Sequence, residues 1–182
     1  MTEAQKKDIF KSILVLTVIC LVTSALLAIV NSFTSPVSQS NALAREEAAR
    51  REVLSAAESF EQIDVEEGEN IQSAYVGYDA QGNPVGWIFT VTGKGFGGNI
   101  SVMCAIGTDG RVIGCNALDI SNETRTLGGQ VAEEEYSDQY IGEDSTLLNV
   151  DAISGATVTS NAYLGCVREA FEAYETVRGE SK

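Results

Sequence analysis

The chain has 182 residues with 12 basic and 26 acidic side chains, a net charge of −14, and its length suits one compact domain with an appendage. We do not expect so acidic a chain to bind nucleic acid or an anionic membrane surface, because both require clustered lysine and arginine. The absence of histidine excludes a histidine-dependent hydrolase and a histidine-ligated metal site.

The N-terminal segment predicts a single transmembrane helix over residues 12–32. Ile13–Val30 carries no charge and would span about 27 Å as a helix, close to the thickness of a bilayer core. Lysines precede this run and neutral residues follow it, which predicts residues 1–11 in the cytoplasm and the later residues outside. A cleaved signal peptide is the alternative. However, the apolar run exceeds the usual length of a signal core, and no convincing small-x-small cleavage site follows it.

A short linker and then a folded domain are expected after the span. Residues 33–41 are polar with one proline, which is typical of a linker, and the domain would occupy residues 42–182. Ala42–Phe60 is predicted to be helical, because its apolar residues recur at helical spacing. These apolar residues are Ala49, Val53, Ala56 and Phe60. The acidic stretch Glu61–Asn70 is expected to be a solvated loop.

Four segments have the composition of β-strands: Ala74–Tyr78, Val85–Val91, Ile100–Ile106 and Arg111–Ala117. An Asp-Gly turn joins the last two strands as a hairpin. A turn centred there places Cys104 opposite Cys115 and Ile106 opposite Ile113, which makes one face of the hairpin apolar. The glycine-rich loop Gly93–Gly98 is not a Walker loop, since its lysine lacks the following serine or threonine.

The four cysteines have no C-x-x-C spacing, so neither a zinc site nor a thioredoxin-type motif is expected. Cys20 follows two bulky residues, whereas a lipoprotein attachment site needs a small one. Cys104 and Cys115 could form a disulfide outside the cell or could fill the core as two small side chains. The sequence leaves both alternatives open.

Two helices are expected in the C-terminal part. Val131–Ile141 should include a short helix, and Asn161–Val177 should form the last one. The apolar side of the last helix comprises Tyr163, Val167, Ala170, Phe171 and Tyr174. The predicted fold class is therefore α+β: one N-terminal transmembrane helix, then a domain with an antiparallel sheet and flanking helices.

A hydroxyl-rich segment, Asp151–Ser160, precedes the last helix. Its small residues allow another molecule to approach the backbone, and a helix N-terminus favours a bound anion. The ordinary interpretation is a loop with a helix cap at Thr159 or Ser160.

The order D-x-x-S-G-A-T over residues 151–157 resembles the flavinylation motif of FMN-binding domains. The N-terminal span, the glycine-rich loop and the segment Glu123-Thr124-x-x-Leu127-Gly128 extend the likeness over essentially the whole chain. Together they resemble the G subunit family of Rnf ion-translocating electron-transport complexes, to which the C subunit of the sodium-pumping Nqr complex is closely related.

The resemblance implies that a separate flavin transferase attaches FMN to Thr157 through a phosphoester. The other residues that it assigns to the cofactor site are Asp151, Ser154, Gly155, Ala156, Thr159, Ser160, Glu123, Thr124, Leu127 and Gly128. The chain departs from the family at Arg125-Thr126, where proline and glycine are common. This departure changes the stiffness of the loop near the flavin ring.

The implied function is electron relay, without the NAD or ferredoxin site itself, in a complex that couples ferredoxin:NAD electron transfer to ion translocation. The implied partners are the other membrane subunits of that complex. The alternatives are an Nqr-type subunit, an independent extracellular flavin carrier and a flavin-free binding or assembly module. Unmodified Thr157 in protein from the native host would favour the flavin-free module.

Overall fold

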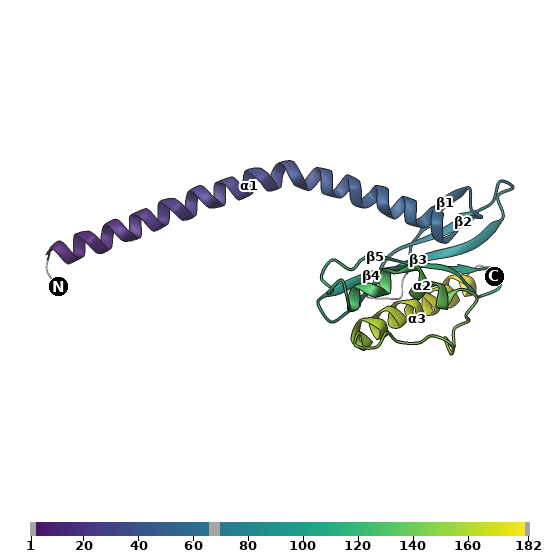
Figure 1. Ribbon diagram of the computed structural model, residues 1–182. Coiled ribbons are helices and arrows are strands. Elements are labelled where there is room, and N and C mark those ends of the chain that lie inside the picture. Colours follow the sequence, from purple (N-terminus) through teal and green to yellow (C-terminus); the bar gives the residue numbers. More distant parts are fainter. Residues whose placement is uncertain (1–2, 66–69, 181–182) are drawn as a thin grey trace. The chain divides into compact units, whose positions relative to one another are not determined.

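The computed structural model describes residues 3–65 and 70–180. The chain forms two compact units, Met1–Ala44 and Arg45–Lys182. The second unit has the predicted α+β fold class and is built around a five-stranded sheet (Figure 1). The end of the expected acidic loop, residues 66–69, lies outside the described residues.

Helix α1 spans Glu3–Val53 without interruption. The stretch 33–41, expected to be a linker, is therefore helical. A proline removes one helical hydrogen bond. This cost is offset because extending an existing helix is easier than nucleating a second one. Within the described residues, one helical segment, Ile13–Ser32, is long and apolar enough to cross a membrane. Because α1 ends at Val53, the prediction that Phe60 belongs to this helix is wrong.

The sheet is fully antiparallel and has the order β1-β2-β3-β4-β5. Its strands are β1 Ser59–Ile63, β2 Ile71–Tyr78, β3 Pro84–Lys94, β4 Asn99–Gly107 and β5 Val112–Asp119. The four predicted strands are confirmed as β2 to β5. Strand β1 is not predicted from the sequence. It occupies the end of the expected helix and the start of the expected acidic loop.

The register of the β4–β5 hairpin confirms one predicted pair and corrects the other. Cys104 lies opposite Cys115, but Ile106 lies opposite Val112. A register shift between Ala105 and Ile106 accounts for the difference, since it moves the pairing by one residue. Ile113 consequently remains partly exposed.

Helix α3, Thr157–Glu180, packs on one face of the sheet (Figure 1). Its predicted apolar side is confirmed, because Tyr163, Val167 and Phe171 are buried with Ala170 and Tyr174. Phe89 and Val91 of β3 join this core. Each large apolar side chain buried here contributes about 1.5–3 kcal/mol relative to an exposed one.

The end of α1 covers the opposite face of the sheet. Ala49, Val53 and Leu54 form a second core with Ile88 of β3 and Met103 of β4. Phe89 and Ile88 are consecutive but belong to different cores, as expected for alternating side chains. The sheet is thus a layer between helices.

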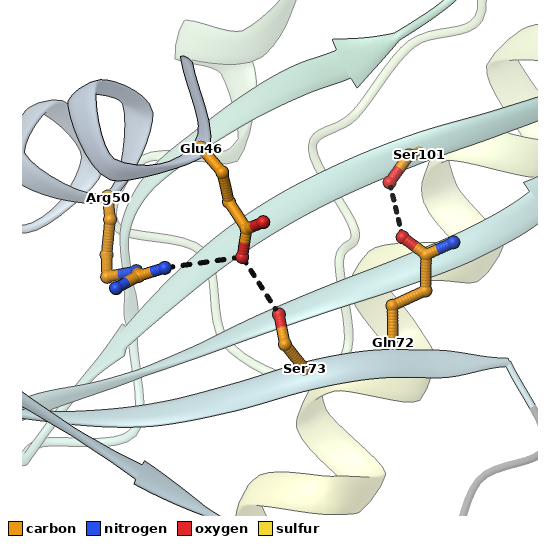
Figure 2. Close-up of polar contacts among 5 residues, drawn as sticks. All are labelled: Glu46, Arg50, Gln72, Ser73 and Ser101. Atoms are coloured by element: carbon orange, nitrogen blue, oxygen red, sulfur yellow. Dashed lines mark hydrogen bonds and ion pairs between the residues drawn. The ribbon is translucent and has the colours of Figure 1, made fainter. Parts of the chain in front are cut away.

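A polar contact also joins α1 to the sheet (Figure 2). Ser73 of β2 donates a hydrogen bond to Glu46 Oε1 at 3.3 Å, and the same oxygen pairs with Arg50 at 3.3 Å. The Arg50 guanidinium lies 3.6 Å from the ring centroid of Tyr75.

A second polar contact lies within the sheet. The Ser101 hydroxyl of β4 donates a hydrogen bond to Gln72 of β2, so side chains of these two strands are also linked.

The segment between β5 and α3 contains short helices: η1 Gly128–Ala132, α2 Glu134–Ser137 and η2 Asp138–Tyr140. They confirm the expected short helix within Val131–Ile141. Helix α3 begins at Thr157 and not at Asn161. Thr159 and Ser160 therefore lie within its first turn and are not helix caps.

Candidate functional site

A cavity of about 330 Å³ lies at the N-terminal end of α3. Three segments distant in sequence line it: the loop after β3, the segment after β5 and the first turn of α3. The lining residues are Phe96, Glu123, Thr124, Leu127, Gly128, Gly155, Ala156, Thr157, Val158 and Thr159. Ligand pockets typically measure about 300–1,000 Å³, so this cavity lies at the small end of that range.

The hydroxyl-rich segment turns sharply into α3. Gly155 has a φ of 81°, a conformation that disfavours residues with a Cβ. The Ala156 N–H donates to Ile153 O at 3.0 Å, which closes this turn. Because α3 begins at Thr157, the first backbone N–H groups lack intrahelical acceptors and can bind an anion.

The hydroxyl side chains of this segment fall into two environments. Ser154 and Thr157 are exposed, whereas Thr159 and Ser160 are 0% and 1% exposed. Ser160 Oγ accepts a hydrogen bond from the Ile153 N–H at 3.0 Å. The Thr159 hydroxyl donates to Glu123 Oε2 at 2.9 Å. The buried hydroxyls are therefore already used within the fold.

Glu123 also contacts the loop at residues 95–98, here called the glycine loop. The Gly97 N–H donates to Glu123 Oε1 at 2.8 Å. A Cβ at Gly128 would overlap Glu123 Oε2, so a larger residue here would displace the carboxylate. One carboxylate thus lies where three segments meet.

The segment around Arg125-Thr126 forms a tight turn, although neither position is proline or glycine. Both the Leu127 N–H and the Gly129 N–H donate to Thr124 O at 2.9 Å. Gln130 Nε2 donates to Thr126 O at 2.7 Å. These hydrogen bonds fix the turn that presents Leu127 and Gly128 to the cavity.

Buried tyrosines support the first turn of α3 from behind. The Tyr136 hydroxyl lies 3.2 Å from that of Tyr140 and donates to Ser160 O at 3.4 Å. Burial raises the pKa of Tyr140 and of Tyr163 far above the ordinary tyrosine value. The phenols of Tyr140 and Tyr163 therefore stay neutral.

The structure brings most of the predicted site residues to this cavity. The eight that line it are Glu123, Thr124, Leu127, Gly128, Gly155, Ala156, Thr157 and Thr159. Asp151, Ser154 and Ser160 are not among the lining residues, and the Asp151 N–H instead donates to Gln139 Oε1 at 3.0 Å.

Sequence reasoning missed two residues of the cavity. Phe96 is 80% exposed and Val158 is 52% exposed. Phe96 could have been identified as an aromatic residue inside a glycine-rich loop, because such a loop has no core in which to bury the ring.

A larger hollow of about 530 Å³ includes Glu133, Glu135 and Tyr136, but Ile153 is its only lining residue from the Asp151–Ser160 segment.

Comparisons with known proteins identify a domain family over the part of the chain that contains the cavity residues. Residues 95–172 match the FMN-binding domain family. The chain resembles the crystal structure of NqrC from Shewanella oneidensis with a TM-score of 0.54 and 17% identity, over 70% of this chain and 91% of that one. At this identity the likeness shows a shared fold.

Two relatives match along nearly their whole length. The G subunit of the proton-translocating ferredoxin:NAD(+) oxidoreductase complex of Clostridium ljungdahlii is 26% identical, over 97% of each chain. The G subunit of the ion-translocating oxidoreductase complex of Methanosarcina acetivorans is 30% identical, over 97% of this chain and 100% of the relative. The chain therefore belongs to the family of G subunits of Rnf-type ion-translocating oxidoreductase complexes.

Proposed function

We propose that the chain is a membrane-anchored electron-transfer subunit of an Rnf-type complex and carries FMN through a phosphoester bond to Thr157. The family match and the cavity at the FMN-binding domain support this function. When bound, the flavin supplies the redox chemistry, and the chain supplies its position and electrostatic surroundings.

The observation that carries the proposal is the placement of the Thr157 hydroxyl. Thr157 is exposed, is the first residue of α3 and lines the cavity. Thr159 lines the same cavity, but it is fully buried and donates its hydroxyl hydrogen to Glu123. A modifying enzyme can therefore reach Thr157 and not Thr159.

The residues present fit an attached FMN. Helix α3 offers free N–H groups and a positive dipole end to the phosphodiester, which keeps a negative charge. Gly155, which has no side chain, and the small Ala156 leave the backbone accessible. The apolar side chains of Leu127 and Val158 line the cavity and are about half exposed, which suits one face of an aromatic ring.

A separate flavin transferase is expected to form the bond. A lone threonine is a weak nucleophile, and the chain has no histidine to activate it. The Ile13–Ser32 span would anchor the subunit in the cell membrane beside the other subunits of the complex. Covalent attachment would keep the flavin in place outside the cytoplasm.

Expression of the full chain with a compatible flavin transferase tests the attachment point. In wild-type protein, flavin fluorescence should migrate with the denatured chain in a gel, and the intact mass should include FMN. Thr157→Val keeps the shape but removes the oxygen, so it should abolish covalent flavin and leave the fold intact.

Two variants serve as matched controls. Ser154→Ala removes the other exposed hydroxyl of the Asp151–Ser160 segment and should keep covalent flavin, because Ser154 does not line the cavity. Thr159→Val should keep at least some flavin, since losing the hydrogen bond to Glu123 costs about 1.5–3 kcal/mol, which a domain of this size should tolerate. Fluorescence in denatured Thr157→Val, or an unmodified wild-type chain despite an active transferase, would refute the proposal.

A further inference from the structure

We propose that Glu123 is a positioning residue of the flavin site: it joins the glycine loop to α3, and its negative charge lowers the reduction potential of the bound flavin. This inference rests on the proposed function, because it concerns the same cavity.

The contacts of Glu123 hold two cavity walls together. Glu123 Oε1 accepts from the Gly97 N–H at 2.8 Å, and Glu123 Oε2 accepts from the Thr159 hydroxyl at 2.9 Å. The Phe96 N–H in turn donates to Thr159 Oγ1 at 3.4 Å. The glycine loop and the first turn of α3 are therefore linked both through the carboxylate and directly.

The packing around the carboxylate leaves it little freedom. A Cβ at Gly95 would overlap Glu123 Oε1, and a Cβ at Gly128 would overlap Glu123 Oε2. A Cβ at Gly97 would overlap Asn122 O, next to the glutamate in sequence. Glycine at these three positions allows the backbone to close around Glu123.

A carboxylate suits this position better than a neutral amide. Thr159 Oγ1 already accepts from Phe96, so its own hydrogen must go to another acceptor, and Gly97 requires a second acceptor. Glutamate offers two acceptor oxygens, whereas glutamine offers one. A glutamine whose oxygen accepts from the Gly97 N–H would turn its NH2 toward Thr159, and the Thr159 O–H would then lose its acceptor.

The charge of Glu123 acts on whatever occupies the cavity. Glu123 is the one ionisable side chain among the described residues that line it. Gaining electrons makes a flavin more negative, and a fixed negative charge nearby opposes this change. The effect is strengthened where protein replaces water. The carboxylate is only partly exposed, so water screens it incompletely.

Redox titration of the flavin absorbance in purified full-length protein tests the charge. We expect the midpoint potential of Glu123→Gln to shift to a more positive value than that of the wild type. Glu135→Gln removes the same charge from an exposed position on α2 and should leave the midpoint unchanged. Glu123→Asp retains the charge and should shift the midpoint less than Glu123→Gln. An unchanged or more negative midpoint in Glu123→Gln would overturn the proposal.

Thermal melting of flavin-free full-length protein, made without the transferase, tests the link itself. Glu123→Gln and Thr159→Val should each lower the melting temperature, and the double variant should lose less than the sum of both, because the two residues share one hydrogen bond. Thr159→Ser restores the hydroxyl and should recover most of the loss. Fully additive losses would contradict the link. Because this measurement needs no flavin, it remains decisive even if Thr157 proves unmodified.

Discussion

Cys104 and Cys115 lie side by side on β4 and β5, and both thiols are free and buried in the structure. Burial raises the pKa of Cys115 well above the ordinary thiol value, and its hydrogen bond to Cys104 acts in the same direction. Burial also raises the pKa of Cys166 to about 12. A raised pKa lowers the thiolate fraction at a given pH, so these thiols should react slowly.

Alkylation with iodoacetamide at about pH 8, near the ordinary thiol pKa, should therefore spare Cys115 and Cys166 in native protein. After denaturation without reductant, all four cysteines should react, and peptide mass mapping counts them. Directly opposed strand residues are also close enough for a disulfide, so the experiment should use protein made under oxidising conditions. A linked Cys104–Cys115 peptide that disappears on reduction would contradict the packing role.

At the scale of single residues, the sequence predicts Thr157 as the attachment point, but it does not explain why the nearby Thr159 hydroxyl is buried and bonded. Thr157 ends the motif and Thr159 follows two residues later, and both side chains carry a hydroxyl group. The difference comes from Glu123, which lies 36 residues before Thr159 and engages only that hydroxyl. A contact of this kind depends on tertiary packing, which local sequence patterns do not encode. Phe96 differs in this respect, because an aromatic residue within a glycine-rich loop is a local sequence signal.

Among the elements, the end of α1 is held on the sheet by Arg50. Its guanidinium lies over the Tyr75 ring and pairs with Glu46, and only 14% of its side chain is exposed. Arg51 pairs with Glu47 at 3.1 Å, but 59% of its side chain is exposed. The two arginines thus form a matched pair, since both make an i,i+4 ion pair and they differ in burial and in the Tyr75 contact.

Arg50→Met should lower the free energy of unfolding by about 1–2 kcal/mol, because it removes a partly desolvated cation–π contact and an ion pair. Arg51→Met should change it by less than about 0.5 kcal/mol. Thermal melting of the full chain in detergent compares the two variants. Equal losses would show that the Tyr75 contact does not stabilise the domain.

The elements themselves were predicted unevenly. Alternating apolar residues and the Asp-Gly turn are enough to predict strands β2 to β5. Helical periodicity is enough to predict the buried side of α3. The register shift at Ala105/Ile106 leaves no local sequence pattern. Helix α3 begins four residues earlier than the sequence predicts, because the hydroxyl residues in Thr157–Ser160 favour a helix-cap position as strongly as a helical one. The helical continuation through residues 33–41 follows from cooperativity and not from composition.

At the scale of the whole molecule, the prediction concerns the side of the membrane on which the second unit lies. Lys6, Lys7 and Lys11 precede the Ile13–Ser32 segment, and the first basic residue after it is Arg45. Basic residues near a span stay in the cytoplasm, so the second unit should lie outside. An outside location would also explain a covalent flavin, since a dissociated flavin would be lost from the cell surface.

Protease added to sealed protoplasts tests this orientation. Trypsin should remove the second unit, whose exposed Lys94, Arg111 and Arg125 offer cleavage sites, and should leave a membrane-bound N-terminal fragment. Peptide mapping of that fragment should find Lys6, Lys7 and Lys11, because a retained anchor keeps the lysines that a cleaved signal peptide would lose. Lysed protoplasts provide the control that the unit can be digested. Protection in sealed protoplasts together with digestion after lysis would place the flavin site in the cytoplasm, where the positive-inside argument does not allow it.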